Sequence, residues 1–273
     1  MHRRWLAPTS GSLVIAALVA WAQGGLLKAE TSTTYCFSSG ANETGFDFCL
    51  SSNGNITLLR SPVGGSTEHI RVGVITEGYA VCDSDDIAYD YGSSVSVPGI
   101  HRAAFGPTTV VSGCAGGSLP CTLQRDTANG KYRLKMVFNW NTIDKEINIT
   151  TTLTNLQSVP ANNVVLMRFA DADVEGTFED IGDISRDSSW ARQGPGPGLR
   201  LGLSALTPKI PHWVALQGPN PPTDYLSCIN DNIAATPYQG DVGLLAGYDF
   251  SQNPPYYLGA GKSKTVKFQY RRD

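Results

Sequence analysis

The clearest hydrophobic pattern in this chain lies between residues 131 and 176. In its first part, every second position is aromatic or aliphatic: Tyr132, Leu134, Met136, Phe138 and Trp140. Lysine, arginine and asparagine fill most of the positions between them. Because alternate side chains of a strand point to opposite faces, this pattern predicts a half-buried β-strand.

Two further strands are predicted directly after it. The first has Ile147, Ile149 and Leu153 on one side, with asparagine and threonine on the other. A turn at residues 158–162 leads to the next strand, residues 164–174, which is apolar at first and acidic at its end. Short polar connections between consecutive strands predict that all three form an antiparallel meander.

The rest of the chain also consists of short alternating hydrophobic and polar runs separated by turn residues. Further strands are expected near residues 46–48, 56–59, 70–75, 79–81, 95–97, 108–111, 199–206, 212–216 and 264–270. The 273 residues include 29 glycines and 16 prolines, and few stretches have a helical period. We therefore expect an all-β fold, a single large antiparallel β-sandwich of two sheets stapled by disulfides.

The first residues are predicted to be a signal peptide. A basic start, His2 to Arg4, precedes a short apolar run at residues 13–20, and Ala20-Trp21-Ala22 offers a cleavage site. The favoured cut follows residue 22, with a cut after residue 29 as the alternative, and a single domain then spans residues 30–273. The Arg3-Arg4 pair could belong to a twin-arginine export signal, but such a pair is more commonly the basic start of an ordinary signal peptide. The chain is expected to be secreted, or periplasmic in a bacterium.

The charge of the chain argues against two classes of partner. Its formal net charge is −3, and removing residues 1–22 takes away two arginines and leaves −5. There is no basic run, so neither nucleic acid nor an anionic membrane surface is an expected partner. The apolar run of the leader is too short to span a bilayer, so no membrane span is expected after it is removed.

All six cysteines follow the leader, and an even number in an exported chain favours disulfides. No CxxC pair supports a zinc or thioredoxin-type site. Six cysteines allow 15 pairings, and the sequence does not choose among them. The favoured set joins neighbours along the chain and leaves one long-range staple: Cys36–Cys49, Cys114–Cys121 and Cys82–Cys228.

Two segments carry a resemblance to known proteins. The run TTLTNLQSVPANNVVLMRFADADVEG and the last residues, GAGKSKTVKFQYRRD, resemble exported bacterial β-sandwich proteins of unassigned role. They are similar, more faintly, to large sandwiches of the galactose-mutarotase type. That resemblance implies a sandwich fold. It does not imply the activity, because His69, His101 and His212 lack the settings of a mutarotase's catalytic residues.

The strongest candidate for chemistry is an acidic cluster, with seven acids in the seventeen residues from 171 to 187. The run DADVEG has alternating oxygen donors followed by glycine, as calcium loops do. It departs from an EF-hand because its twelfth position is Gly182 and because it follows a strand. The cluster is either a calcium site or a solvated acidic loop. The candidate ligands for Ca²⁺ are Asp171, Asp173, Glu175, Asp180 and Asp183.

No catalytic residues are identified. The run GAGKS at residues 259–263 lacks the first glycine of a phosphate-binding loop and precedes a predicted strand. The three remaining histidines have no metal-binding spacing. Acid pairs for glycoside hydrolysis can be drawn from residues 171–187 or 83–90, but only their separation in space would give them meaning.

Tyrosines in turn-rich segments are the remaining candidates for ligand contact: Tyr89, Tyr91, Tyr256 and Tyr257. Exposed aromatic rings stack on sugars, and they also cover the ends of sandwiches. The leading hypothesis is a secreted, non-catalytic binding or surface-associated module whose ligand is unknown. The alternative is a carbohydrate-active or carbohydrate-binding protein on a mutarotase-like sandwich, with a glycan as its partner.

Overall fold

The structure is a computed structural model, and it confirms the all-β class. It describes residues 34–38, 45–61, 67–70, 77–92, 100–101, 105–141, 146–176, 180–195, 198–218, 220–223, 228, 238–252 and 257–273. All of these belong to one compact unit, Ser32–Asp273. The expected leader lies outside them.

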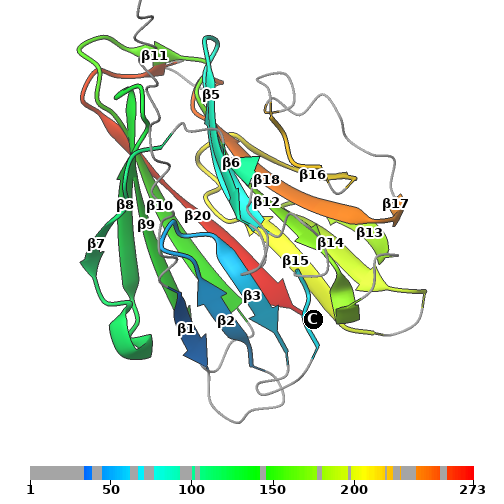
Figure 1. Cartoon of the computed structure of the whole chain (residues 1–273). Helices are drawn as coiled ribbons and strands as arrows, with labels where there is room; N and C mark the ends of the chain where they lie inside the picture. The colour runs from blue at the N-terminus through cyan, green and yellow to red at the C-terminus, as the bar shows by residue number, and fades with distance from the viewer. Residues whose placement is uncertain are drawn as a thin grey trace, which may run out of the picture. The chain divides into compact units, whose positions relative to one another are not determined.

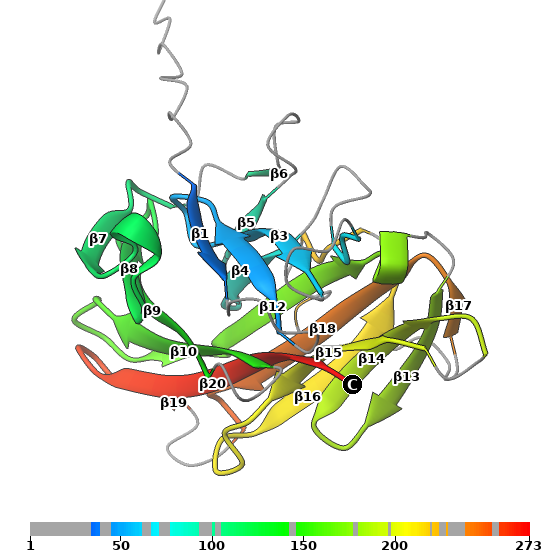
Figure 2. The same ribbon diagram turned by 90° about the horizontal axis from the view of Figure 1, so that it is seen from below.

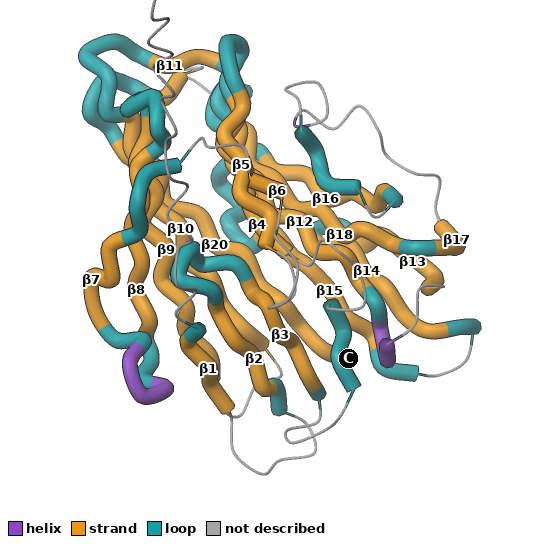
Figure 3. The backbone as a smooth tube through the Cα atoms, viewed as in Figure 1, coloured by secondary structure: helices purple, strands orange, loops and turns teal. Residues whose placement is uncertain are grey.

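Among the described residues the regular elements are strands and two single-turn 3₁₀ helices, η1 (Ala115–Gly117) and η2 (Val174–Gly176) (Figure 3). No described helix has the length and apolar character needed to cross a membrane.

Two large antiparallel sheets carry most of the fold (Figure 1). The nine-stranded sheet has the order β17 (Tyr238–Gly240), β13 (Asp180–Ser185), β14 (Ser188–Gln193), β15 (Arg200–Ala205), β20 (Ser263–Arg272), β10 (Glu146–Asn155), β9 (Tyr132–Asn141), β8 (Cys121–Asp126) and β7 (Thr109–Ser112). The six-stranded sheet has the order β16 (His212–Gln217), β18 (Val242–Asp249), β12 (Val165–Ala172), β4 (Glu77–Cys82), β5 (Ile87–Gly92) and β6 (Ile100–His101).

Two smaller sheets complete the fold. They are the three-stranded sheet of β1 (Tyr35–Ser38), β2 (Asp47–Leu50) and β3 (Ile56–Arg60), and the pair of β11 (Ala161–Asn162) and β19 (Tyr257–Leu258). In Figure 2 the three-stranded sheet lies on the same side of β9 and β10 as β4 and β5.

One large core lies between the nine-stranded sheet and the sheets that cover its inner face. At one end of it the six-stranded sheet comes so close that a Cβ on Gly182 would lie 2.8 Å from Leu216 Cδ1. At the other end the three-stranded sheet covers the nine-stranded sheet, and the rings of Phe48 and Trp140 lie 5.7 Å apart. Burial of apolar surface from three sheets is therefore the main source of stability.

The hairpin predicted from the alternating pattern is confirmed. Strands β9 and β10 pair along their full length, from Glu146 opposite Asn141 to Asn155 opposite Tyr132. The inward residues of β9 are buried from Tyr132 to Phe138, Trp140 is half-buried, and Lys135 is exposed.

The predicted three-stranded meander is wrong. The second neighbour of β10 is β20, the last strand of the chain, and β12 lies in the other sheet between β18 and β4. The physical reason is burial: β10 has one solvated face, whereas every residue of β12 is buried. A strand that is apolar on both faces needs cover on both, and the middle of the six-stranded sheet provides it.

The outer face of the six-stranded sheet is covered as well. A second core cluster gathers there around Met167, Phe169, Leu245 and Cys228. The disulfide between Cys82 and Cys228 ties the covering segment to β4.

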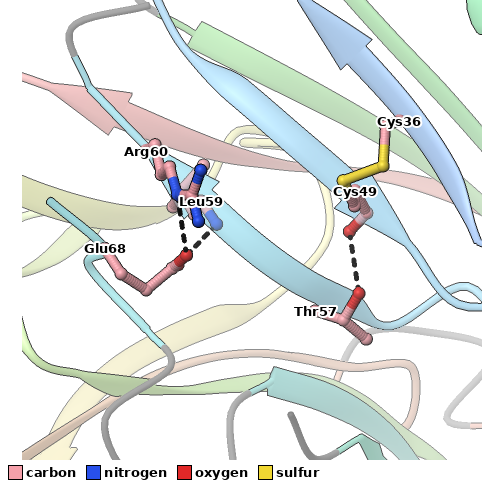
Figure 4. The surroundings of a disulfide bond; sticks show 6 residues. All are labelled: Cys36, Cys49, Thr57, Leu59, Arg60 and Glu68. Carbon is pink, nitrogen blue, oxygen red and sulfur yellow. Dashed lines mark hydrogen bonds and ion pairs between the residues drawn. A yellow bond between two sulfur atoms is a disulfide. The ribbon is translucent and has the colours of Figure 1, made fainter. Parts of the chain in front are cut away.

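The structure joins Cys36 to Cys49, Cys82 to Cys228 and Cys114 to Cys121, the three pairs favoured by the sequence. The first clips β1 to β2, where the two cysteines lie directly opposite each other (Figure 4). The same figure shows Glu68 accepting a hydrogen bond from the Leu59 backbone at 2.6 Å, which ties the following segment to β3.

Candidate functional site

A pocket lies at the end of the sandwich where β10 leads into β11 and β19 leads into β20. Its volume is about 500 Å³, within the usual range for small-molecule sites. Pro160 forms one wall, and residues of the 257–264 segment, including Tyr257, Lys262 and Lys264, form the other. These two segments are about a hundred residues apart in sequence, so no local pattern predicts that they meet.

A single buried asparagine joins the two walls. Asn155, at the end of β10, has no exposed surface. Its Nδ2 donates to the Val159 carbonyl at 2.8 Å and to the carbonyls of Leu258 and Gly259 at 2.9 and 3.3 Å. Because a buried amide and its carbonyl partners must all be satisfied, Asn155 holds the pocket in one geometry.

The GAGKS run forms the turn beside the pocket. The Lys262 amide donates to the Gly259 carbonyl at 3.0 Å, and Gly261 takes a φ of 63°, which favours glycine. The turn leads into β20, so a strand follows Lys262 and Ser263, in agreement with rejecting a phosphate-binding loop.

Of the four tyrosines proposed to contact ligand, the structure places Tyr257 at the pocket, with 38% of its surface exposed. The expectation is wrong for Tyr91, which is fully buried and donates its hydroxyl to the Pro222 carbonyl at 2.7 Å. Tyr89 is half-buried and stacks on Tyr91, because both lie on one face of β5 over the second core cluster. Tyr256 lies outside the described residues.

The acidic cluster is a separate feature, and the structure brings only part of it together. Asp171 is the last residue but one of β12 and interacts electrostatically with Asp173 and Asp180. Asp241, which precedes β18, joins them and hydrogen bonds to Asp171. Asp241 lies some seventy residues further along the chain, and no local signal identified it.

Burial shapes the chemistry of this cluster. Asp171 is 4% exposed, and burial raises the pKa of its carboxyl to about 9, with the negative charges of Asp173 and Asp241 adding to the effect. Burial also raises the pKa of Asp241. A proton held by the Asp171–Asp241 pair therefore reduces the repulsion among these carboxylates. A bound cation would have the same effect.

The other two proposed ligands point elsewhere. Glu175 is exposed, and its backbone amide donates to His69 Nδ1 at 3.2 Å. Asp183 is exposed on β13, three residues after the buried Asp180. In the described parts of the chain, no three or more acids, histidines or cysteines are grouped so as to hold a metal ion. Calcium binding stays a prediction.

A buried charge network that sequence reasoning missed crosses the core. Arg168 on β12 donates to Glu77 Oε1 on β4 at 2.7 Å, and both side chains are at most 1% exposed. Tyr270 on β20 donates to the same oxygen at 2.9 Å, and the Ile56 backbone donates to the other at 2.7 Å. The available signal was an arginine inside the apolar run VVLMRFA, since a buried cation needs an anionic partner.

The other acids considered for hydrolysis are held by cations. Asp90 pairs with Arg125 in the core, and Asp83 pairs with Lys131 at 3.1 Å. Asp187 Oδ1 accepts a hydrogen bond from His212 Nε2 at 3.0 Å. These acids therefore serve to join strands and loops.

Comparison with known proteins identifies a fold and no family. No family model matches the chain, and no curated protein matches it. Among solved structures, a bacterial glucoamylase complexed with acarbose matches with a TM-score of 0.53 and 13% identity, over 88% of this chain and 33% of its own.

Two further structures match with lower scores. A polysaccharide lyase has a TM-score of 0.44 and 11% identity, over 84% of this chain and 32% of its own. A protein from Synechocystis sp. PCC 6803 has a TM-score of 0.46 and 8% identity, over 89% of this chain and 96% of its own. The chain thus spans about a third of the glucoamylase and of the lyase. At these identities the glucoamylase match shows a shared sandwich fold alone.

Proposed function

We propose that this protein is a non-catalytic carbohydrate-binding protein of the cell exterior and that the pocket beside Tyr257 is its binding site. The observation that carries the proposal is an exposed tyrosine ring on the wall of a cavity of about 500 Å³. A tyrosine offers a flat apolar face for the C–H side of a sugar ring and a hydroxyl for the ring's polar edge.

The fold and the disulfides support this assignment. The glucoamylase whose sandwich this chain resembles is complexed with acarbose. Three disulfides are typical of proteins that mature in an oxidising compartment, such as the extracellular space or the periplasm.

The residues around the pocket favour binding over hydrolysis. Glycoside hydrolases use a pair of carboxyl groups on either side of the scissile bond. The described residues that line this pocket are lysines and neutral residues. The carboxyl of Asp171 is too buried to meet a polymer.

Tyr257→Ala tests the proposal. Affinity electrophoresis and calorimetry against a panel of soluble neutral and acidic polysaccharides should show binding by the unaltered protein. Tyr257→Ala should lower the affinity for the bound polymer about tenfold, which corresponds to roughly 1.4 kcal/mol. Tyr257→Phe should retain most of it, because the stacking face remains.

Val110→Ala is the matched control, because Val110 is also an exposed apolar side chain, at 45%, but lies on β7 away from the pocket. Its affinity should equal that of the unaltered protein. Binding that is unaffected by Tyr257→Ala would show that the site lies elsewhere. Release of shortened sugars from the polymer would show that the protein is an enzyme.

A further inference from the structure

The pocket beside Tyr257 has a positive lining in an acidic protein. Lys262 and Lys264 both line it, although the chain carries a formal net charge of −3. Neither ammonium has an ion-pair partner among the described residues, and none of the described lining residues is acidic. Several cations elsewhere on the surface are paired with carboxylates, as in Arg133–Asp126, Lys131–Asp83 and Arg271–Asp273.

The backbone that carries these lysines is held in place. The Asn155 amide donates to the Lys262 carbonyl at 3.0 Å, and the Lys262 amide closes the turn on Gly259. A Cβ added at Gly259 would lie 3.0 Å from Lys262 Cγ and 3.8 Å from Tyr257 Cε2. The aliphatic stem of Lys262 and the tyrosine ring therefore both lie within 3.8 Å of the position that a side chain at Gly259 would occupy.

The pocket thus combines two chemistries a few ångströms apart. The Tyr257 ring and Pro160 offer apolar contact, and exposed apolar side chains at Leu156 and Val159 continue it outside the pocket. Lys262 offers an ammonium on the same lining. A ligand that satisfies both has an apolar face and an anionic group attached to the same ring.

We propose that the pocket selects an acidic glycan, with the carboxylate or sulfate of one sugar unit held by Lys262 and Lys264 while its ring packs against Tyr257. This inference rests on the carbohydrate-binding function proposed above and adds the class of sugar. Asn155 acts as a positioning residue that orders both walls before the ligand arrives, which reduces the entropy lost on binding.

Matched pairs of polymers test the charge requirement. Polygalacturonate is compared with its methyl ester, in which the carboxylates are neutral, and dextran sulfate is compared with dextran. The protein should bind at least one acidic polymer roughly tenfold more tightly than its neutral partner. Whichever acidic polymer binds more tightly identifies the anionic group as carboxylate or sulfate. Raising the salt from about 0.05 M to about 0.5 M should weaken this binding, because ionic screening shortens the Debye length.

The double variant Lys262→Gln/Lys264→Gln should abolish the preference, so that it binds the acidic polymer no more tightly than the neutral partner. The control is Lys135→Gln/Lys267→Gln, which removes the same charge from exposed positions on β9 and β20 outside the pocket. The control should bind within about twofold of the unaltered protein.

The two proposals fail in different ways. Equal losses in both double variants would mean non-specific attraction to a charged polymer and would overturn the acidic-sugar inference. Binding that depends on Tyr257 but is equal for the acidic and neutral partners would also overturn it and leave the carbohydrate-binding proposal standing. Absence of any Tyr257-dependent binding would overturn both.

Discussion

At the scale of single residues, the most consequential features are charged groups placed where water is absent. Arg168 and Glu77 form an ion pair inside the core, and at its edge burial and neighbouring carboxylates raise the pKa of Asp171. A buried ion pair is costly to form, and it is far more costly to leave one partner alone. The first two predictions concern these groups.

Arg168→Met should lower the free energy of unfolding by about 3–5 kcal/mol, because Glu77 would be left in the core without its cation. The double variant Arg168→Met/Glu77→Gln should recover part of that loss. Urea unfolding of each variant measures it. Arg133→Met is the control, since its ion pair with Asp126 is about 40% exposed on both sides and should contribute no more than about 1 kcal/mol. Equal losses at the two arginines would contradict the importance of burial.

Asp171→Asn should make the stability of the protein less dependent on pH. The folded state keeps a proton on Asp171 up to a pKa of about 9, whereas the unfolded chain loses it near pH 4. The unfolded state therefore binds fewer protons between these values, and stability must fall as the pH rises through this window. Asparagine carries no such proton, so the variant should be more stable than the unaltered protein near pH 8–9.

The upper part of that window is the cleanest place to measure. Burial lowers the pKa of His69 to about 4, so the unfolded chain takes up a proton there below about pH 6.5 and stability falls as the pH drops. Thermal unfolding should therefore be followed from pH 6.5 upward. Asp183→Asn, at an exposed position, should keep the slope of the unaltered protein. If the stability of Asp171→Asn changed with pH as steeply as that of the unaltered protein, the proposed proton on Asp171 would be contradicted.

Calcium makes the opposite prediction for the same residues. An ion that binds only the folded state raises its stability, by about 2.7 kcal/mol at a hundred times its dissociation constant. If Asp171 and Asp173 hold calcium, the melting temperature rises in millimolar calcium and falls with chelator, and Asp171→Asn plus Asp173→Asn abolishes the response. An unchanged melting curve across both conditions would rule out calcium and leave the shared proton.

At the scale of single elements, the faces of β9 decide its contribution. Phe138 has no exposed surface and packs in the main core, whereas Lys135 is exposed on the solvated face. The same alternation continues on β10, where threonines occupy the outer face and pair with hydroxyls of β20, as Thr152 does with Thr265 at 2.8 Å. The outer face of this hairpin is therefore polar and ordered.

Phe138→Ala should lower the free energy of unfolding by about 3–5 kcal/mol, the usual range for truncating a core aromatic residue. Lys135→Ala on the same strand should change it by no more than about 0.5 kcal/mol. Denaturant titration of the two variants compares them directly. Similar losses would mean that the faces of β9 are assigned wrongly.

At the scale of the whole molecule, one disulfide connects segments that are far apart in the sequence. Cys82–Cys228 spans 146 residues and fastens the cover of the outer face to β4. In the chain-entropy account, closing a loop of that length stabilises the folded state by about 4–5 kcal/mol. The stability of the outer cover therefore depends on oxidation.

All six cysteines are expected to be oxidised in the mature protein. Intact mass measured after alkylation in denaturant without reductant should show no added label, and reduction before alkylation should add six labels. Any label on unreduced, folded protein would contradict complete pairing. Reduction of the folded protein should also lower its melting temperature.

Features that depend on neighbouring residues could be predicted from the sequence. Alternation of side chains identified β9 and β10 and their buried faces, because a two-residue period is a local property of a strand. Spacing along the chain favoured the disulfides of Cys36 with Cys49 and of Cys114 with Cys121, and the third pair followed by elimination.

Contacts between segments that are distant in the sequence became known from the folded structure. The second partner of β10 is β20, Asp241 joins the acids around Asp171, and Arg168 is balanced by Glu77. The pocket exists because Asn155 joins Pro160 to the segment after Tyr257. Strand partners and partners of buried charges depend on which large surfaces of the protein are buried against each other. The pattern of neighbouring residues along the chain contains no information about those long-range contacts.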